Sequence, residues 1–227
     1  MRLSLPEAAH LLQVSERTVK RWVDRFDMPC ERGPDGPVFD RNRLIAWADR
    51  YSFRLAAEVP GEEEAPLPEL GDALEEGGIH HGLEAAEVED ALAEVSRRLR
   101  LPDLVDREFL HQVLLAREDL GSTGIGNGIA LPHVRAPLVL HVAKPLVGLF
   151  FLERAIDWGA IDGKPVDTLF TLLSPGVRQH LHLLSRISFC LRDPDLQKLL
   201  AARAEAPAIL NRVRELDRGI RENNRDS

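Results

Sequence analysis

The chain has 227 residues, a length that suits one large domain or two modest ones. Its 44% hydrophobic and 29% charged residues are typical of a globular protein. The longest apolar run, Pro145–Leu152, is too short to span a bilayer, and the N-terminus lacks the apolar region of a signal peptide. Two distant cysteines, Cys30 and Cys190, offer no disulfide framework. The composition therefore excludes a disulfide scaffold, and we expect a cytoplasmic protein without membrane insertion.

The net charge of −8 is unevenly distributed along the chain. Residues 1–55 carry 10 Lys and Arg against 8 Asp and Glu, whereas the rest of the chain is strongly acidic. A weakly basic head on an acidic body indicates two modules with different partners.

The head, residues 1–55, is predicted to be helical with one hairpin. Ser4 is expected to cap a helix that continues to Leu12, and Ser15 a second helix over 16–26. In the second helix, apolar side chains at i, i+3, i+4 and i+7 predict one buried face formed by Val19, Trp22, Val23 and Phe26. Two short strands around a Gly/Pro turn over 28–39 follow, and then a third helix capped by Asp40 and extending through Trp47.

An acidic segment separates the head from the body. Residues 56–78 contain eight acidic residues and no Lys or Arg, and their prolines and glycines interrupt any helical period. We expect a self-repelling linker over 56–67, a second domain over 68–220 and a polar tail over 221–227.

The body alternates amphipathic helices with short apolar runs. Helices are predicted over 84–99, 107–118, 179–191 and 193–204, and buried strands over 146–152 and 166–173. This alternation predicts an α/β fold with helices flanking a sheet.

A glycine-rich loop at 121–128 ends in Pro132 and His133. Glycines allow backbone amides to approach a ligand closely, and a nest of such amides favours a phosphate. The pattern is neither a P-loop nor a dinucleotide fingerprint, because no Gly-Lys-Ser/Thr follows and no helix opens after Gly128. A neutral imidazole is a competent nucleophile, so His133 is a candidate to accept a phosphoryl group. The predicted phosphate loop consists of Ser122, Thr123, Gly124, Gly126, Asn127 and Gly128.

The segment 117–133 resembles the active-site signature of the type-2 enzyme IIA domains of bacterial phosphotransferase systems. The run Leu120–Ala130 is most similar to the nitrogen-regulatory branch, and the segments 160–167 and 180–184 fit the same family. The resemblance covers roughly residues 67–220 and implies a mixed β-sheet flanked by helices.

By motif, the resemblance implies a set of active-site roles. His133 would accept phosphate from a histidine-containing phosphocarrier protein, Arg117 would stabilise the phosphate, and His180 would orient or stabilise it. Because His180 and His182 point about 200° apart on a helix, only one of them is expected to face the site. Glu118 occupies the first polar position of the signature without an assignable role. A structural role remains an alternative for His133, for Arg117 as a surface ion-pair residue and for His180 as a packing residue.

One position departs from the family pattern. Val134 stands where the signature has Gly, Ala or Cys, and a β-branched side chain there would restrict the backbone and add bulk beside the phosphoryl site. Slower transfer, altered docking and no effect all remain open.

No cofactor or metal is predicted. The pairs His80-His81 and His180/His182 lack further ligands at suitable spacing for zinc.

Residues 3–51 resemble the helix-turn-helix of excisionase-like and MerR-like domains, with the hairpin as a wing. The resemblance implies base contacts from the start of the second helix and phosphate contacts further along it. The predicted DNA-binding residues are Ser15, Arg17, Thr18, Lys20, Arg21 and Arg25. The wing is acidic and proline-rich, and the weakly basic head is attached to an acidic body. We therefore expect DNA binding to need a dimer or a higher assembly, and a head used for protein contacts or dimerisation remains an alternative.

Together these observations predict a phosphorylation-responsive regulator of the nitrogen-type phosphotransferase system, a phosphohistidine carrier rather than a turnover enzyme. Phosphorylation would change binding to DNA, to the head or to a regulated protein. The alternative is a sugar-system IIA component that passes phosphate to a separate IIB subunit. A third hypothesis is a phosphate-dead interaction module in which Val134 has closed the site.

Overall fold

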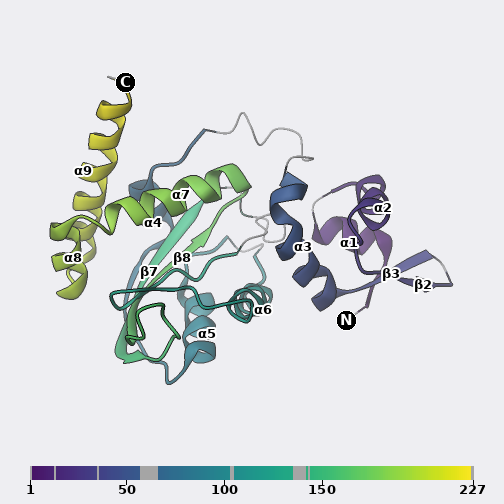
Figure 1. Ribbon diagram of the computed structural model, residues 1–227, viewed down its shortest axis with the longest axis horizontal. Coiled ribbons are helices and arrows are strands. Elements are labelled where there is room, and N and C mark those ends of the chain that lie inside the picture. Colours follow the sequence, from purple (N-terminus) through teal and green to yellow (C-terminus); the bar gives the residue numbers. More distant parts are fainter. Residues whose placement is uncertain are drawn as a thin grey trace.

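The computed structural model describes residues 2–12, 14–34, 36–56, 66–102, 105–134, 142 and 144–225. The elements form a head, up to residue 56, and a module that begins at residue 66 (Figure 1). Most of the predicted linker, residues 57–65, lies outside the described part.

The head contains three helices and a small sheet. Helix α1 (Leu5–Leu11) begins with the predicted cap, since Ser4 and Glu7 form a reciprocal capping box. Helix α2 (Glu16–Arg25) is capped by Ser15, and its Val19 and Trp22 are fully buried as predicted. Strands β1 (Arg2–Leu3), β2 (Glu31–Gly33) and β3 (Gly36–Asp40) form an antiparallel sheet in the order β1-β3-β2.

Helix α3 (Arg41–Ala56) follows the sheet and is longer than predicted. The carboxylate of Asp40 accepts from the Arg43 amide, which confirms the expected cap. The predicted end at Trp47 was wrong, because Leu44, Ile45, Trp47 and Ala48 are all buried and the helix continues beyond them.

The module is built on a five-stranded mixed sheet in the order β4-β7-β8-β6-β5. The long central strands β7 (Leu146–Ile156) and β8 (Val166–Leu173) are antiparallel, as expected for two adjacent buried apolar runs. Strand β4 (Ile79–Leu83) runs parallel to β7, and β6 (Ile129–Ala130) parallel to β8. Strand β5 (Gly124–Gly126) forms the outer edge beside β6.

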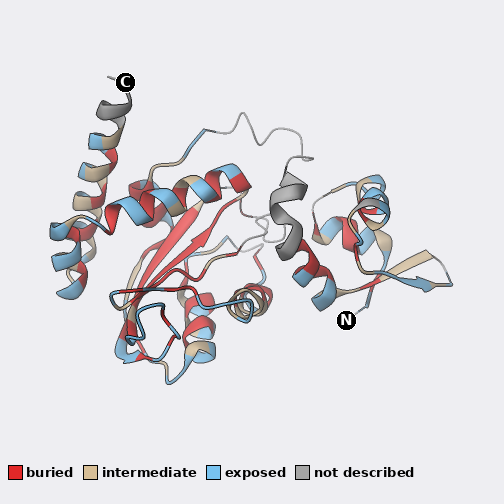
Figure 2. Cartoon of the chain, viewed as in Figure 1, coloured by how far each residue is buried: buried red, intermediate tan, exposed pale blue. Residues whose placement is uncertain are grey.

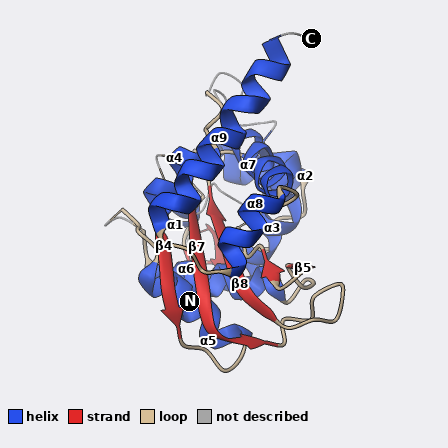
Figure 3. Ribbon diagram, turned by 90° about the vertical axis from the view of Figure 1, so that its left-hand side faces the viewer, coloured by secondary structure: helices blue, strands red, loops and turns tan. Residues whose placement is uncertain are grey.

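Helices cover both faces of this sheet (Figures 2 and 3). One face packs against α5 (Val88–Arg98) and α6 (Arg107–Glu118). The other face packs against α4 (Leu70–Gly77), α7 (Val177–Cys190), α8 (Pro194–Ala201) and α9 (Ala206–Arg225). The predicted α/β architecture with a mixed sheet flanked by helices is therefore confirmed.

Three boundaries differ from the prediction. The acidic segment was expected to break any helix up to Gly78, but Leu70, Ala73 and Leu74 form the buried face of α4. The helix predicted to start at residue 84 starts at Val88, because strand β4 and a turn precede it. The predicted polar tail is helical as far as Arg225, since α9 continues through it.

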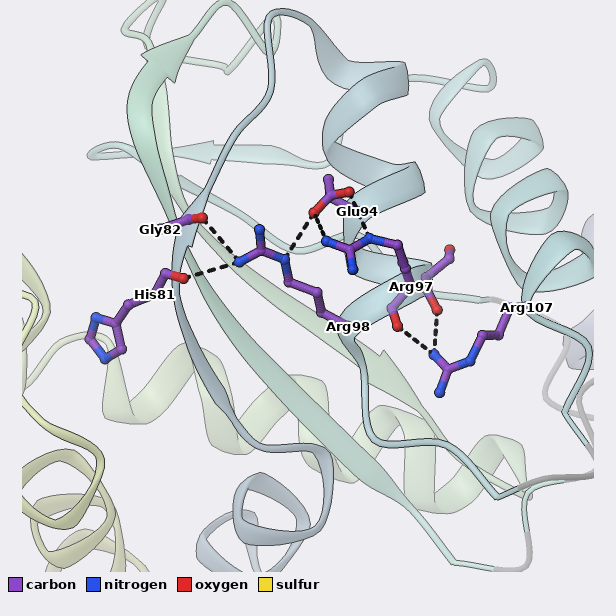
Figure 4. A network of polar contacts seen from close by, with 7 residues as sticks. His81, Gly82, Glu94, Arg97, Arg98 and Arg107 are labelled. Carbon is purple, nitrogen blue, oxygen red and sulfur yellow. Dashed lines mark hydrogen bonds and ion pairs between the residues drawn. The ribbon is translucent and has the colours of Figure 1, made fainter.

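A network of arginines fixes the start of α6 (Figure 4). The Arg107 guanidinium donates to the carbonyls of Ser96, Arg97 and Leu99 at the C-terminal end of α5. Arg98 in turn donates to the carbonyls of His81 and Gly82 on β4. The Arg107 bonds satisfy carbonyls that the end of α5 leaves without intrahelical partners, and together the two arginines connect α6 through α5 to the sheet.

The head contacts the module through α3 and α6. The Arg41 guanidinium lies 4.3 Å from the centre of the Phe109 ring and donates to Gln112 Oε1 at 3.3 Å. Asp106 Oδ2 is 3.9 Å from Arg41. Buried apolar residues of the head and of α5 and α6 form one continuous cluster, so the head packs on the module rather than projecting from it.

Candidate phosphoryl-acceptor site

The predicted phosphate loop forms a β-hairpin. Strands β5 and β6 are joined by Asn127 and Gly128, whose φ angles are +54° and +76°. Positive φ at both central residues defines a type I′ turn, for which Asn-Gly is the preferred pair. Gly124 packs closely against the backbone of Ala160. A Cβ added to Gly124 would lie 2.7 Å from the Ala160 Cα, so only glycine fits at this position.

Several amides of this loop are already used within the chain. The Thr123 amide donates to Glu118, the Gly124 amide to Ser122 Oγ and the Asn127 amide to Asp162, at 2.7, 3.0 and 2.9 Å. These three amides therefore do not form the predicted anion nest. Asp162 takes a second amide from Lys164, and these bonds hold the pKa of its carboxyl below the usual range.

His133 lies where the chain leaves β6. It forms a parallel bridge with Leu172 of β8, and its ring is half-buried. Nδ1 is 2.7 Å from the carbonyl oxygen of Leu131. Because a carbonyl only accepts, Nδ1 carries the proton and Nε2 carries the lone pair of the neutral ring.

A second histidine faces His133 from helix α7. The ring centres of His133 and His180 are 5.2 Å apart, and His180 is 3% exposed. His182 instead approaches the Pro68 carbonyl at 3.1 Å, and burial lowers its pKa. The prediction that only one of the two α7 histidines faces the site is confirmed.

A known protein family matches the part of the chain that contains the hairpin, His133 and His180. The family described as "Phosphoenolpyruvate-dependent sugar phosphotransferase system, EIIA 2" matches residues 72–215. The chain belongs to this family. Residues 72–215 are therefore an EIIA type-2 module, and residues 1–71 lie outside the match.

Nitrogen regulatory proteins are among its relatives. The chain is 45% identical to that of Bradyrhizobium diazoefficiens over 101 residues, which are 43% of this chain and 63% of the relative. It is 38% identical to that of Pseudomonas aeruginosa over 121 residues, 52% of this chain and 76% of the relative. The crystal structure of nitrogen regulatory protein IIA-Ntr from Neisseria meningitidis has a TM-score of 0.56 and 26% identity, covering 63% of this chain and 98% of that one.

Arg117 lies in the last turn of α6 of the EIIA module. Its Nη1 donates to the Gly121 carbonyl at 2.8 Å, at the start of the loop that leads to the hairpin. The structure thus connects Arg117 to the loop, and its role toward phosphate remains a prediction.

Glu118 and Trp158 are site residues to which the sequence analysis gave no role. Glu118 Oε2 accepts from Thr123 Oγ1 at 2.6 Å, beside the bond from the Thr123 amide to Oε1. Trp158 Nε1 donates to the same Thr123 hydroxyl at 3.2 Å, and its carbonyl accepts from Ser122 Oγ. The first polar position of the signature pointed to Glu118, whereas nothing in the sequence pointed to Trp158.

Val134 does not lie on the side of the His133 ring. Its side chain is 1% exposed and belongs to the apolar cluster formed with α5 and α6. Ile129 and Leu131 belong to the opposite cluster, on the side of α7 that carries His180. The expectation of added bulk beside the phosphoryl site was wrong, because side chains alternate along the extended backbone.

The predicted DNA-contacting residues lie on or before α2 of the head. Ser15 Oγ accepts from the Thr18 amide and also bonds the Thr18 hydroxyl, so Ser15 caps the helix and Thr18 is held against this cap. Arg17, Lys20 and Arg21 are exposed, and the side chain of Arg25 lies outside the described part. The head therefore presents three basic residues along one helix.

The described residues contain neither a cluster of metal ligands nor a membrane-spanning helix. No group of three or more His, Cys, Asp or Glu side chains there is arranged to hold a metal ion. No helix in the described ranges is long and apolar enough to cross a membrane.

Proposed function

We propose that this chain accepts a phosphoryl group on Nε2 of His133 from a histidine-containing phosphocarrier protein. The observation that carries the proposal is the bond from Nδ1 to the Leu131 carbonyl, which directs the lone pair of the ring to Nε2. In the transfer, the phosphorus–nitrogen bond of the donor breaks and a bond from phosphorus to His133 Nε2 forms. Membership of the EIIA family supports this chemistry.

The transition state of phosphoryl transfer carries negative charge on three equatorial oxygens. In this proposal Arg117 and His180 stabilise that charge. The 5.2 Å separation of the histidine rings leaves His180 beside the accepting group. Donors held in place before the reaction act without reorganisation, which is why a buried His180 suits this role.

We propose further that residues 1–55 are a helix-turn-helix domain that binds DNA as a homodimer. The exposed Arg17, Lys20 and Arg21 on α2 support a nucleic-acid surface. Because affinity grows with the number of phosphates neutralised, two copies would be needed. The chain would then be a cytoplasmic regulator whose partners are the phosphocarrier and a DNA site or regulated protein.

The phosphorylation signal would reach the head by added charge. The described contact between the head and the module is made by α3 on α6 through Arg41. The basic side of α2 thus stays exposed in the docked head. Phosphorylation adds about −1.5 to −2 charges near α7 and would change how the head and its partners bind.

A sugar-system role remains the alternative. The chain is 38% identical over 103 residues to the fructose-specific EIIA component of Haloferax volcanii, covering 44% of this chain and 65% of that one. In this alternative, phosphate passes from His133 to a separate IIB subunit. The third hypothesis, a site closed by Val134, loses its physical basis because Val134 packs on the face of the sheet opposite to the His133 ring.

Intact-mass analysis tests the proposal. The full chain and His133→Ala are incubated with phosphoenolpyruvate, enzyme I and the phosphocarrier protein. One acid-labile phosphoryl group on the wild type and none on the variant is the expected result, and an unmodified wild type would overturn it. Loss of the group to an added IIB subunit would favour the sugar-system alternative, whereas a change in DNA retention on phosphorylation would favour the regulator.

A further inference from the structure

A line of hydrogen bonds connects Glu118 at the end of α6 to the ring of His133. Glu118 takes the amide and the hydroxyl of Thr123, at 2.7 and 2.6 Å. The Thr123 carbonyl accepts from the Leu131 amide at 3.0 Å. The Leu131 carbonyl then accepts from His133 Nδ1 at 2.7 Å.

The middle of this line is buried. Thr123 is 4% exposed, Leu131 7% and Trp158 2%. Hydrogen bonds in such surroundings are stronger than in water, so this line holds the backbone between Glu118 and His133 in one arrangement. The Trp158 indole fixes the orientation of the Thr123 hydroxyl from the other side.

We propose that Glu118 is a positioning residue for the phosphoryl acceptor. It holds Thr123, whose carbonyl accepts from the Leu131 amide and so fixes the backbone at Leu131. The Leu131 carbonyl, held in place by this anchoring, keeps the His133 proton on Nδ1. This inference rests on the proposed function, because it assigns Glu118 a role in presenting Nε2 to the donor.

Both oxygens of the Glu118 side chain act as acceptors. The two donors of Thr123 meet different oxygens, Oε1 and Oε2, so a carboxylate accepts both. A glutamine has only one accepting oxygen, and its NH₂ group would meet one of the donors. Glu118→Gln therefore forces the Thr123 hydroxyl to accept from the NH₂ group instead of donating, and it replaces two bonds to a charged group with weaker neutral ones at little change in volume.

Asp162 provides a matched control. It also accepts two amides, from Asn127 and Lys164, but it anchors the tip of the same hairpin. The line from Glu118 to His133 does not pass through it. Asp162→Asn therefore loosens the hairpin at a different point with the same chemical change.

The ring nitrogens of His133 report the effect without any phosphoryl transfer. In the full chain with ¹⁵N-labelled histidine at pH 8.5, imidazole is neutral and its tautomer is read from the nitrogen shifts. We expect a protonated Nδ1 in the wild type and in Asp162→Asn, and a mixture of tautomers in Glu118→Gln. The rate of phosphoryl acceptance should fall on the order of 10- to 100-fold in Glu118→Gln and stay within about twofold in Asp162→Asn.

The outcomes separate this inference from the proposed function. Wild-type nitrogen shifts in Glu118→Gln would overturn the positioning role, whatever the rate. An unphosphorylated wild type whose tautomer still depends on Glu118 would overturn the proposed function alone. If Glu118→Gln does not fold, Thr123→Val takes its place, since it removes only the hydroxyl, and Thr123→Ser should restore the wild-type shifts.

Discussion

His133 and Val134 are neighbours in the chain, yet their side chains lie on opposite faces of the sheet. The ring of His133 faces His180 of α7, whereas Val134 packs in the cluster that includes residues of α5 and α6. An extended backbone enforces this alternation. Val134 therefore contributes to the core and not to the surface around the His133 ring.

Val134→Ala should cost stability and leave phosphoryl acceptance unchanged. Removing buried methyl groups from a packed site costs about 1–2 kcal/mol of unfolding free energy, because the cavity refills only partly. Urea denaturation and the initial rate of phosphorylation check the two halves separately. A rate that rises severalfold in the alanine variant would show that Val134 obstructs the site after all.

Arg41→Ala should loosen the head from the module. The substitution removes the contact with the Phe109 ring and the hydrogen bond to Gln112. The Arg41 side chain is only 19% exposed, so solvent weakens these contacts little. Faster hydrogen exchange is expected in the first turns of α6. Arg43→Ala is the control, because Arg43 is 67% exposed and its ion pair with Glu31 lies within the head. Equal exchange in both variants would contradict a role for Arg41.

Asp217→Ala should destabilise the module strongly. Asp217 is fully buried, pairs with Arg186 of α7 and accepts from the Gly71 amide of α4. Its removal leaves a buried guanidinium without its counterion, a change that costs about 3–5 kcal/mol. Chemical denaturation should show this loss, whereas Asp195→Ala, in an exposed pair with Lys198, should stay within about 0.5 kcal/mol. Similar losses in the two variants would refute the assignment.

The pair of Asp193 and Arg212 should make stability depend on pH. Hydrogen bonds from Arg212 lower the pKa of Asp193 to about 2. A carboxyl whose pKa is lower in the folded state stabilises the protein above its unfolded pKa, near 4, and this gain is lost as the pH falls toward 2. The melting-temperature gap between the wild type and Asp193→Asn should thus be widest near neutral pH and close in acid. A gap that does not vary with pH would show that the charge is irrelevant.

The elements with strong local signals were predictable from the sequence. Ser4 and Ser15 cap their helices as expected, α6 has the predicted bounds, and the apolar runs form β7 and β8. The histidine pair followed from a motif and from the angular spacing of helical residues. These features depend on residues close together in the chain.

The missed features depend on distant contacts or on weak patterns. Strand β4 contains His80 and His81, whose rings stack on Phe150 and Phe151 of β7. Its sequence lacks the alternation of polar and apolar residues that would predict a strand. Helix α9 buries Ile209, Val213 and Asp217, a narrow stripe that includes a charge. The Asn127-Gly128 pair was a readable hairpin signal that the prediction treated as part of an anion nest.

The Arg41–Phe109 contact has a practical consequence for work on isolated pieces of the chain. Phe109 is only 4% exposed while the head is in place. A fragment starting near Pro66 would lack α3 and leave this ring and its apolar neighbours on α6 open to solvent. Exposed patches of this kind promote self-association, so the fragment should be less soluble than the full chain and its oligomers should not be mistaken for a physiological assembly.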